Sequence, residues 1–350
     1  MNTLGKNIRL TSYGESHGEV IGAVLDGMPS NFEIDLEFIQ MQLNRRRPGQ
    51  SAITTTRNES DELIVNSGIF DGKTTGAPIH LQIPNTNHNP KDYSHLKDVL
   101  RPSHADYTYQ AKYGIRDYKG GGRSSARITA GWVAGGALVQ DFLSKQGIQI
   151  AAYVKQVGSV ALDKDAQWYS MEQIDGNAVR CPDDIVANKM IEEIAKAKKE
   201  NDSLGGVIEC VIKGVKVGVG NPVFEKLNAQ LAHAMFSINA VKGFEIGGGF
   251  EMSKKRGSEV NDSFGMDNEK VITHSNNSGG IQGGISNGMD IVFRVAFKPT
   301  ATIGTAQQTI DTAGKDVILE VEGRHDPCVV PRAVPIVETL SALVLGDLIV

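Results

Sequence analysis

The pattern of apolar and polar positions near the start of the chain predicts two strands followed by a helix. Residues 8–13 and 20–28 are rich in aliphatic and β-branched side chains, and the polar run GESHGE separates them. Asp35 is a suitable N-cap for a helix over 35–47. The apolar face of this helix consists of Leu36, Ile39 and Leu43. Shorter strands are expected near 63–65 and 79–83, inside a polar, turn-rich stretch.

The longest apolar segment of the first half follows three glycines, Gly120–Gly122. Residues 126–143 are largely apolar and predict a buried helix, with Ser124 and Ser125 at the position of an N-cap. Glycines let the backbone approach a ligand closely, and a helix N-terminus offers unpaired N–H groups. We therefore expect an anion at this turn. Its spacing matches neither the dinucleotide fingerprint nor the P-loop, so the kind of anion stays open.

The second half repeats this succession of strands and helices. Residues 148–160 predict a strand, and 166–200 predict a polar segment that contains a surface helix. A strand is then expected from Gly205. A further helix is indicated by Phe224, Leu227, Leu231 and Met235.

These similarities suggest an internal duplication. GGVIECVIKGVKVG resembles the earlier HGEVIGAVLDGMP, and both halves end on a Gly-Arg turn that leads into a long apolar helix. We interpret the chain as one domain, 1–350, with pseudo-repeat halves at roughly 14–145 and 205–350. Chance similarity between two common strand–helix units is the alternative.

Composition narrows the class of protein. The 350 residues are 40% hydrophobic and 22% charged, which suffices for a substantial core. A net charge of −5 argues against a nucleic-acid or acidic-membrane partner. We find no apolar leader and no membrane span, and the three cysteines form no metal or disulfide pattern. These observations predict a protein of a reducing, cytoplasmic compartment.

Arginine is concentrated beside the glycine and histidine motifs of this acidic chain. Arg binds phosphate and carboxylate in bidentate fashion and keeps its charge at physiological pH. So many guanidinium groups within a few turns predict a small ligand with several negative charges. The arginines concerned are Arg45, Arg46, Arg47, Arg101, Arg116, Arg123, Arg127, Arg324 and Arg332.

Two histidines lie in turns that suit proton transfer. His17 in GESHG and His104 in RPSHAD have Gly, Ser, Asp and Arg as neighbours, and imidazole titrates near neutral pH. Because no G-x-S-x-G elbow is present, Ser16 and His17 do not indicate a serine hydrolase. No metal is expected, since no histidine spacing fits a metal site. The residues alone thus predict a phosphorylated, carboxylated metabolite, two histidine acids and a flat cofactor against the later glycine pairs.

The sequence resembles the chorismate synthase family over nearly its whole length. Three segments carry the resemblance: GESHGEVIGAVLDGMP at 14–29, GGRSSARITAGWVAGGAL at 121–138 and RHDPCVVPRAVPIVE at 324–338. RRRPG, RPSHADYTYQAKYG, FSINAVKGFE, GGIQGGIS and FKPT also match family segments in the same order. None of these stretches is a generic motif.

This resemblance implies a fold, a reaction and a cofactor. The implied fold is α/β (mixed α+β), a single-domain β-α-β sandwich assembled as a homotetramer. The implied reaction converts 5-enolpyruvylshikimate 3-phosphate to chorismate and phosphate by 1,4-elimination, the last common step of the shikimate pathway for aromatic amino acid biosynthesis. Reduced FMN (FMNH2) is required without net redox change. NADPH is involved only indirectly, or directly if the enzyme is bifunctional.

The resemblance also implies roles for particular residues. His17 protonates the departing phosphate, His104 protonates or stabilises the reduced flavin, and Asp326 lies near flavin N5 and helps to remove the ring proton. The substrate-binding set, drawn from the resemblance and from the arginine clustering, is Ser16, Arg46, Arg47 and Arg127. The flavin contacts are Arg123, Ser124, Ser125, Asn239, Ala240, Gly283, Lys298, Pro299, Thr300, Ala301, Thr302 and Arg324.

Two departures from the family pattern and two alternative functions accompany this interpretation. Ala52 occupies a place where the family often has another arginine, with Arg57 nearby, which weakens any inference about NADPH. Ala301 lacks a hydroxyl that the family segment often provides. One alternative is a flavin-binding reductase acting on another phosphorylated acid. The other is an RNA-binding protein that uses residues 107–123, against which the net charge counts.

Overall fold

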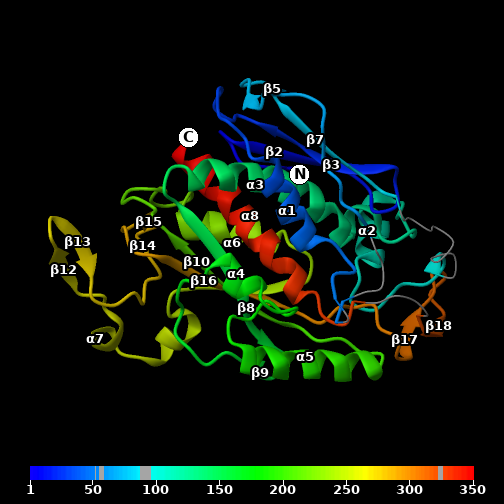
Figure 1. Cartoon of the computed structure of the whole chain (residues 1–350). Helices are drawn as coiled ribbons and strands as arrows, with labels where there is room; N and C mark the ends of the chain where they lie inside the picture. Colours follow the sequence, from blue (N-terminus) through cyan, green and yellow to red (C-terminus); the bar gives the residue numbers. More distant parts are fainter. Residues whose placement is uncertain (52, 55–58, 87–95, 322–325) are drawn as a thin grey trace.

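Helices fill the space between two five-stranded sheets (Figure 1). This arrangement is seen in a computed structural model that describes residues 1–51, 53–54, 59–86, 96–321 and 326–350. The mixed α+β class and the sandwich predicted from the sequence are confirmed. Among the described helices, none combines the length and apolarity needed to cross a bilayer.

The first sheet has the strand order β1-β2-β3-β7-β4, and all its neighbouring strands are antiparallel. Its strands are β1 (Thr3–Leu4), β2 (Arg9–Gly14), β3 (Val20–Asp26), β4 (Ile64–Val65) and β7 (Ile79–Pro84). Along β7, buried and part-buried positions alternate. One face of this strand therefore packs on the helices, as the period of two requires.

The second sheet has the order β11-β16-β10-β8-β9 and is also antiparallel. Its strands are β8 (Gln149–Val157), β9 (Val160–Ala161), β10 (Gly206–Lys213), β11 (Val241–Ile246) and β16 (Ile291–Phe297). On β16, Ile291, Phe293 and Val295 are fully buried. The inner face of this sheet thus completes the core.

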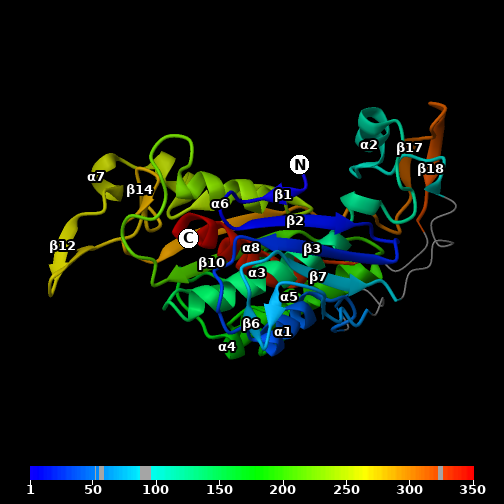
Figure 2. The same cartoon turned by 90° about the horizontal axis from the view of Figure 1, so that it is seen from above.

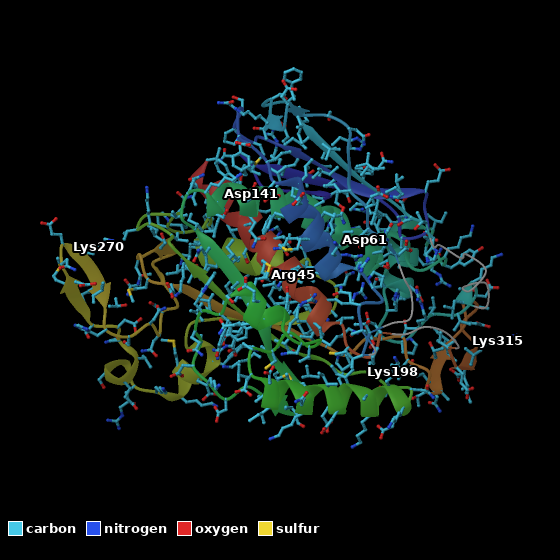
Figure 3. All side chains as sticks on the ribbon, viewed as in Figure 1. Arg45, Asp61, Asp141, Lys198, Lys270 and Lys315 are labelled. Carbon is cyan, nitrogen blue, oxygen red and sulfur yellow. The ribbon has the colours of Figure 1, made fainter. Side chains whose placement is uncertain are left out.

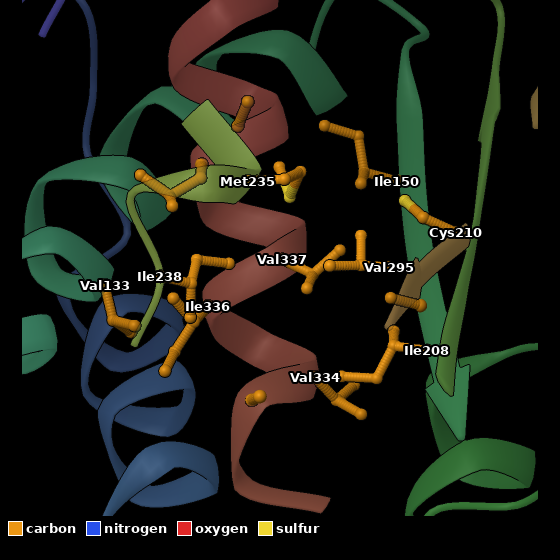
Figure 4. Close-up of a cluster of buried hydrophobic side chains, with 14 of the residues drawn as sticks. Val133, Ile150, Ile208, Cys210, Met235, Ile238, Val295, Val334, Ile336 and Val337 are labelled. Atoms are coloured by element: carbon orange, nitrogen blue, oxygen red, sulfur yellow. The ribbon is translucent and has the colours of Figure 1, made fainter. Parts of the chain in front are cut away.

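The central layer contains α1 (Leu36–Arg46), α3 (Thr129–Ser144), α6 (Leu227–Phe236) and α8 (Val330–Ile349). Helix α3 packs on β3 and β7, α8 packs on β8 and β10, and the two helices contact each other. Figure 4 shows Val334 and Val337 of α8 directed toward Ile208 and Val295 of the second sheet. Burial of each such side chain contributes about 1.5–3 kcal/mol to the free energy of folding.

Both sheets have the same order of connections along the chain. The first half runs β2, β3, α1, β4, β7, α3, and the second runs β8, β10, α6, β11, β16, α8. When β1 and β9 are left out, four strands remain in each sheet. Numbered by their order along the chain, these four lie side by side as first, second, fourth and third. This correspondence supports the proposed duplication. The boundaries 14–145 and 205–350 stay a prediction, and β8, the counterpart of β2 in this order, lies outside the second of them.

Smaller elements extend from the two ends of the sandwich, as the view from above shows (Figure 2). Helix α2 (Asp106–Tyr113) and the hairpin β17–β18 lie at one end, and the hairpin β12–β13 lies at the other. The hairpins were not predicted from the sequence. The remaining elements are β5 (Ile69–Phe70), β6 (Lys73–Thr74), α4 (Met171–Asp175), α5 (Asp184–Lys199), α7 (Gly257–Val260), β12 (Phe264–Asp267), β13 (Lys270–Thr273), β14 (Ile281–Gln282), β15 (Ile285–Ser286), β17 (Gln307–Ile310) and β18 (Asp316–Leu319).

Two helix starts differ from the sequence-based expectation. Helix α3 begins at Thr129 because two short 3-10 turns, Gly122–Ser124 and Ala126–Ile128, come first. Phe224, predicted on α6, precedes that helix and is 88% exposed. The preceding Val223 has a φ of 74°, which a right-handed helix does not allow. The N-cap at Asp35 is confirmed, since its side chain accepts a hydrogen bond from Phe38 N at 2.9 Å.

Candidate active site

The Gly120–Gly122 turn brings the two predicted acids to one place. All three glycines have positive φ, at 82°, 87° and 50°. A Cβ on Gly120 would lie 2.4 Å from His17 Nε2, and one on Gly121 would lie 3.2 Å from His104 Cε1. Glycine is needed here both for the backbone conformation and for the close approach of the imidazoles. The turn is therefore a platform that the two imidazole rings share.

Serine side chains hold this turn in shape. Ser16 Oγ donates to Gly120 O at 3.2 Å, and Ser124 Oγ donates to Gly121 O at 2.7 Å. Ser125 Oγ accepts from Arg127 N at 3.3 Å and caps the second 3-10 turn. The predicted N-cap position is thus occupied, but the helix that it begins is 3-10. The unpaired N–H groups at the N-terminus of α3 therefore lie beyond the Ala126–Ile128 turn, further along the chain from the glycines.

An ion-pair cluster anchors the far side of the His104 ring. Arg101 forms a bidentate pair with Asp106, with both N–O distances 2.8 Å. His104 Nδ1 lies 3.1 Å from Arg101 Nη2 and 3.4 Å from Asp106 Oδ1. The Cε1–Nε2 edge of the ring is the edge that faces Gly121. Nδ1 is thus fixed by the cluster, whereas Nε2 points toward the shared platform.

Asp106 is the charged centre of that cluster, and sequence reasoning did not single it out. Burial raises the pKa of Asp106, but hydrogen bonds from Arg101 and His104 outweigh this effect and hold the pKa well below its usual range. Arg116 adds a contact to Asp106 at 3.2 Å. The Nη2 of Arg116 donates to the carbonyls of Leu96, Lys97 and Val99. Arg101 and Arg116 therefore hold His104 in place, although the sequence suggested ligand binding.

The depressed pKa of Asp106 makes stability depend on pH in a defined direction. Its stabilising contribution is present above the unfolded pKa of about 3.9 and is lost as the pH falls through the lower folded value. Asp106→Asn does not titrate, so it should lose less stability than the wild type between about pH 5 and pH 3. Urea unfolding midpoints at the two pH values measure this. Asp316→Asn, at an exposed position of β18, is the control, and equal losses in wild type and Asp106→Asn would contradict the prediction.

Two of the predicted substrate ligands, Arg46 and Arg127, meet at one carboxylate. Arg46 Nη2 pairs with Asp61 Oδ2, and Arg127 Nη1 pairs with Asp61 Oδ1. The side chains of Arg46, Arg127 and Asp61 are 2%, 3% and 0% exposed. Arg127 Nε also donates to Asn85 Oδ1 at 2.9 Å. The structure thus brings both arginines to one buried cluster.

The pKa shifts of Arg46 and Asp61 leave both groups ionised. Burial lowers the pKa of Arg46 to about 10, with Asp61 opposing that effect and Arg127 adding to it. Burial raises the pKa of Asp61, and the charges of Arg46 and Arg127 more than reverse this. Both groups are therefore charged at neutral pH. Among the described residues, Arg46 Nε is a buried donor with no hydrogen-bond acceptor.

Other arginines have structural contacts in this fold. Arg45, which is labelled in Figure 3, belongs to α1. It pairs with Glu338 of α8 and with Asp175. Arg123 Nη1 donates to Gly14 O at 2.9 Å, which ties the glycine turn to β2. Arg47 ends α1, where its N–H donates to Leu43 O. The flavin contact predicted for Arg123 and the substrate contact predicted for Arg47 stay predictions.

Separate hydrogen bonds link several of the predicted flavin segments to one another and to Asp326. Asn239 Nδ2 donates to Ser124 O at 2.7 Å, and Lys298 N donates to Ala240 O at 2.9 Å. Thr300 Oγ1 donates to Asp326 O at 2.9 Å. Pro299, immediately before Thr300, is exposed, and Ala301 and Thr302 follow Thr300. Within the described part of the chain, Asn239 Oδ1 and Asp326 Oδ1 are buried acceptors that receive no hydrogen bond.

Arg332 joins this segment to the arginine cluster. Its Nη1 pairs with Asp326 Oδ2, and its Nε donates to Arg46 O at 3.2 Å. Arg332 also lines a polar cavity of about 350 Å³, together with Gln50, Thr54, Asn177 and Arg180. The predicted Arg324 lies outside the described residues. Sequence reasoning counted Arg332 among the arginines. It gave Asp106 no role beyond its place in the charged stretch beside the glycines, and it missed Asp61.

Gly283 is the one described flavin residue that the fold places elsewhere. It lies in the β14–β15 turn, and the adjacent Gly284 packs against Lys226 and Asn221 near the start of α6. Both views place this hairpin toward the opposite end of the molecule from α2 (Figures 1 and 2). Within one chain, Gly283 is therefore not brought to the turn that holds His17 and His104.

The fold and the site together define an α+β sandwich protein whose histidine and arginine cluster suits a small, multiply anionic molecule. A family model described as chorismate synthase matches residues 8–350. The chain is 56% identical to the chorismate synthase of Cytophaga hutchinsonii over 347 residues, covering 99% of this chain and 96% of that protein. It is 57% identical to the chorismate synthase of Parabacteroides distasonis, with 99% and 97% covered.

A solved structure shows the same likeness in three dimensions. A crystal structure of chorismate synthase superposes with a TM-score of 0.77 at 31% identity, covering 98% of this chain and 92% of the other. The chain belongs to the chorismate synthase family. It is accordingly an enzyme of the carbon–oxygen lyase class.

Proposed function

We propose that the enzyme converts 5-enolpyruvylshikimate 3-phosphate to chorismate and inorganic phosphate by 1,4-elimination at the Gly120–Gly122 platform. The observation that carries the proposal is the approach of His17 and His104 to adjacent glycines of one turn. A 1,4-elimination breaks a carbon–oxygen bond at one end of the reacting system and a carbon–hydrogen bond at the other. It therefore needs a proton donor and a proton acceptor at separate points, and we assign these roles to His17 and Asp326.

The chain's own residues divide this work. His17 donates a proton to the phosphate oxygen as the carbon–oxygen bond breaks, because imidazole is a suitable acid near neutral pH. The Asp326 carboxylate helps to remove the ring proton. Its Oδ2 is held by Arg332, whereas its Oδ1 is a buried acceptor that no described residue satisfies. Arg46 and Arg127 neutralise the phosphate and carboxylates of the substrate.

Reduced FMN is the proposed cofactor, and the residues present fit it. The unsatisfied acceptor of Asn239 beside Ser124, and the backbone of Lys298–Thr302, form a polar edge next to Asp326. These groups would hold the flavin, with His104 stabilising its reduced form. When bound, reduced FMN supplies electron density for the elimination. NADPH would serve only to regenerate that form.

The alternative is a flavin-dependent reductase that acts on another phosphorylated acid. Binding of reduced FMN, followed by absorbance with and without 5-enolpyruvylshikimate 3-phosphate, distinguishes the two functions. We expect the substrate to perturb the reduced-flavin spectrum and to tighten flavin binding. Oxidation of one flavin for each substrate consumed would instead support the reductase.

The proposal includes assembly and compartment. We propose a homotetramer in the cytoplasm. The free thiols of Cys181, Cys210 and Cys328 are all buried, which suits a reducing compartment. The distance of Gly283 from its own chain's turn suits a flavin contact with another subunit. Light scattering of the purified enzyme tests the tetramer, and a monomeric mass would contradict it.

Gly283→Val tests this flavin contact. The φ of Gly283 is 63°, but no atom lies within 4 Å of an added Cβ, so the structural cost is limited to about 1–2 kcal/mol of backbone strain. We expect the affinity for reduced FMN to fall more than the thermal stability of the apoprotein. Gly314→Val is a matched control, because Gly314 has a φ of 82° and equally open surroundings. Normal binding of reduced FMN by Gly283→Val would remove this hairpin from the flavin site.

A further inference from the structure

The carboxylate of Asp61 is the point at which Arg46 and Arg127 are joined. Asp61 lies in the loop between α1 and β4, and its side chain is fully buried. One oxygen pairs with each guanidinium, so neither arginine is held by both oxygens. The residue also has a φ of 49°, a left-handed conformation that is uncommon outside glycine. Such backbone strain persists only where the surroundings enforce it, and it occurs most often at functional sites.

Without a shared carboxylate the two arginines would not remain together. Two like charges in a buried place repel each other, and each raises the cost of keeping the other ionised. Arg127 has a second acidic neighbour, since Glu59 Oε2 is 4.0 Å from its Nη2. Arg46 has no ion-pair partner besides Asp61 among the described residues. The position of Arg46 therefore depends on Asp61 directly.

The geometry also leaves donors for a ligand. Asp61 takes one nitrogen of each guanidinium, and the Nε and Nη2 of Arg127 donate to Asn85 Oδ1 and Pro84 O, so the donor that is left over belongs to Arg46. The Nε of Arg46 has no acceptor among the described residues, although it is buried. Leaving such a charged donor without an acceptor is costly, and an anion that supplied one would recover that cost.

We propose that Asp61 is a positioning residue that presents Arg46 and Arg127 to the anionic substrate. The inference rests on the proposed function, because it takes the substrate to be the anion that these arginines bind. Asp61 touches neither substrate nor cofactor in this account and acts only through the two guanidinium groups. Its replacement should therefore affect substrate binding first and leave flavin binding intact.

Asp61→Asn, compared with Glu338→Gln, tests the proposal. Glu338 is a suitable match because it is also buried and also pairs with an arginine of α1, namely Arg45, but lies in the helical core. Asp61→Asn should raise the KM for substrate by about 10- to 100-fold, while the Kd for reduced FMN stays unchanged. Glu338→Gln should lower the unfolding midpoint without raising KM. An equal KM in the two variants would overturn the proposal. Normal turnover by the wild type in the same assay would show that the proposed function itself still stands.

A second variant keeps the test decisive if Asp61→Asn does not fold. Asp61→Asn combined with Arg46→Gln removes both charges of the buried pair, which restores charge balance. If Asp61 also positions Arg127, the double variant should have a KM about 10-fold above that of Arg46→Gln alone. Equal KM values for the double variant and Arg46→Gln would show that Asp61 does not act through Arg127 and would overturn the proposal.

Discussion

His17→Ala is expected to lower turnover by about 10²- to 10⁴-fold, the usual contribution of a positioned general acid. The imidazole of His17 packs directly on Gly120, where no larger residue could stand. Loss of the ring removes the proposed proton donor to the departing phosphate but no flavin contact. Binding of reduced FMN should therefore stay nearly intact. Rapid mixing of the variant with reduced FMN and substrate, followed by absorbance and phosphate release, measures both quantities.

His104→Ala provides the contrast for that experiment. The His104 ring lies against Gly121 and is anchored by Arg101. The substitution should therefore alter the reduced-flavin spectrum in the ternary complex as well as turnover. His233→Ala, at an exposed position of α6, is a control that should behave as wild type. Normal turnover of His17→Ala would place the acid elsewhere. Reversed spectral effects would mean that the roles implied by the family do not apply here.

Arg127→Ala and Arg46→Ala should be the most destabilising substitutions in the site. Each removes one of the two ion pairs of the buried Asp61 and leaves the other, so the expected cost is that of a lost charged hydrogen bond, about 1.5–3 kcal/mol of unfolding free energy. Both variants should also bind substrate more weakly, since each removes a guanidinium from the proposed anion site. Urea unfolding and substrate KM measure the two effects.

A surface pair calibrates the stability measurement. Arg9 and Asp26 form an ion pair whose side chains are 49% and 34% exposed, so Arg9→Ala should cost far less than either buried variant. Unchanged substrate affinity in both Arg127→Ala and Arg46→Ala would remove these residues from the site. Unchanged stability would instead contradict the buried pairing with Asp61.

Local elements were predictable because local sequence determines them. The apolar period of 35–47 and the side chain of Asp35 specify α1 and its N-cap without reference to the rest of the chain. The start of α3 was not predictable, because the 3-10 turns before it depend on how Ser125 and the three glycines pack around His17 and His104. The hairpins β12–β13 and β17–β18 carry few core contacts and hence little periodic signal.

The site was only partly predictable for a different reason. His17 and His104 were found because their turns combine Gly, Ser, Asp and Arg. The pairing of charges depends on tertiary distances, which sequence patterns do not encode. Arg101, Arg116 and Arg45 were counted as ligand-binding candidates, yet they hold Asp106 and Glu338. Asp61 was missed because the run NESDE has the pattern of a solvated polar loop, whereas its aspartate is fully buried.

An anaerobic assay of the wild-type enzyme with chemically reduced FMN and 5-enolpyruvylshikimate 3-phosphate tests the central claim most directly. The account predicts that chorismate and inorganic phosphate appear in equal amounts over many turnovers for each flavin, while the flavin ends the reaction still reduced. Absence of phosphate release, or oxidation of one flavin for each substrate consumed, would contradict it.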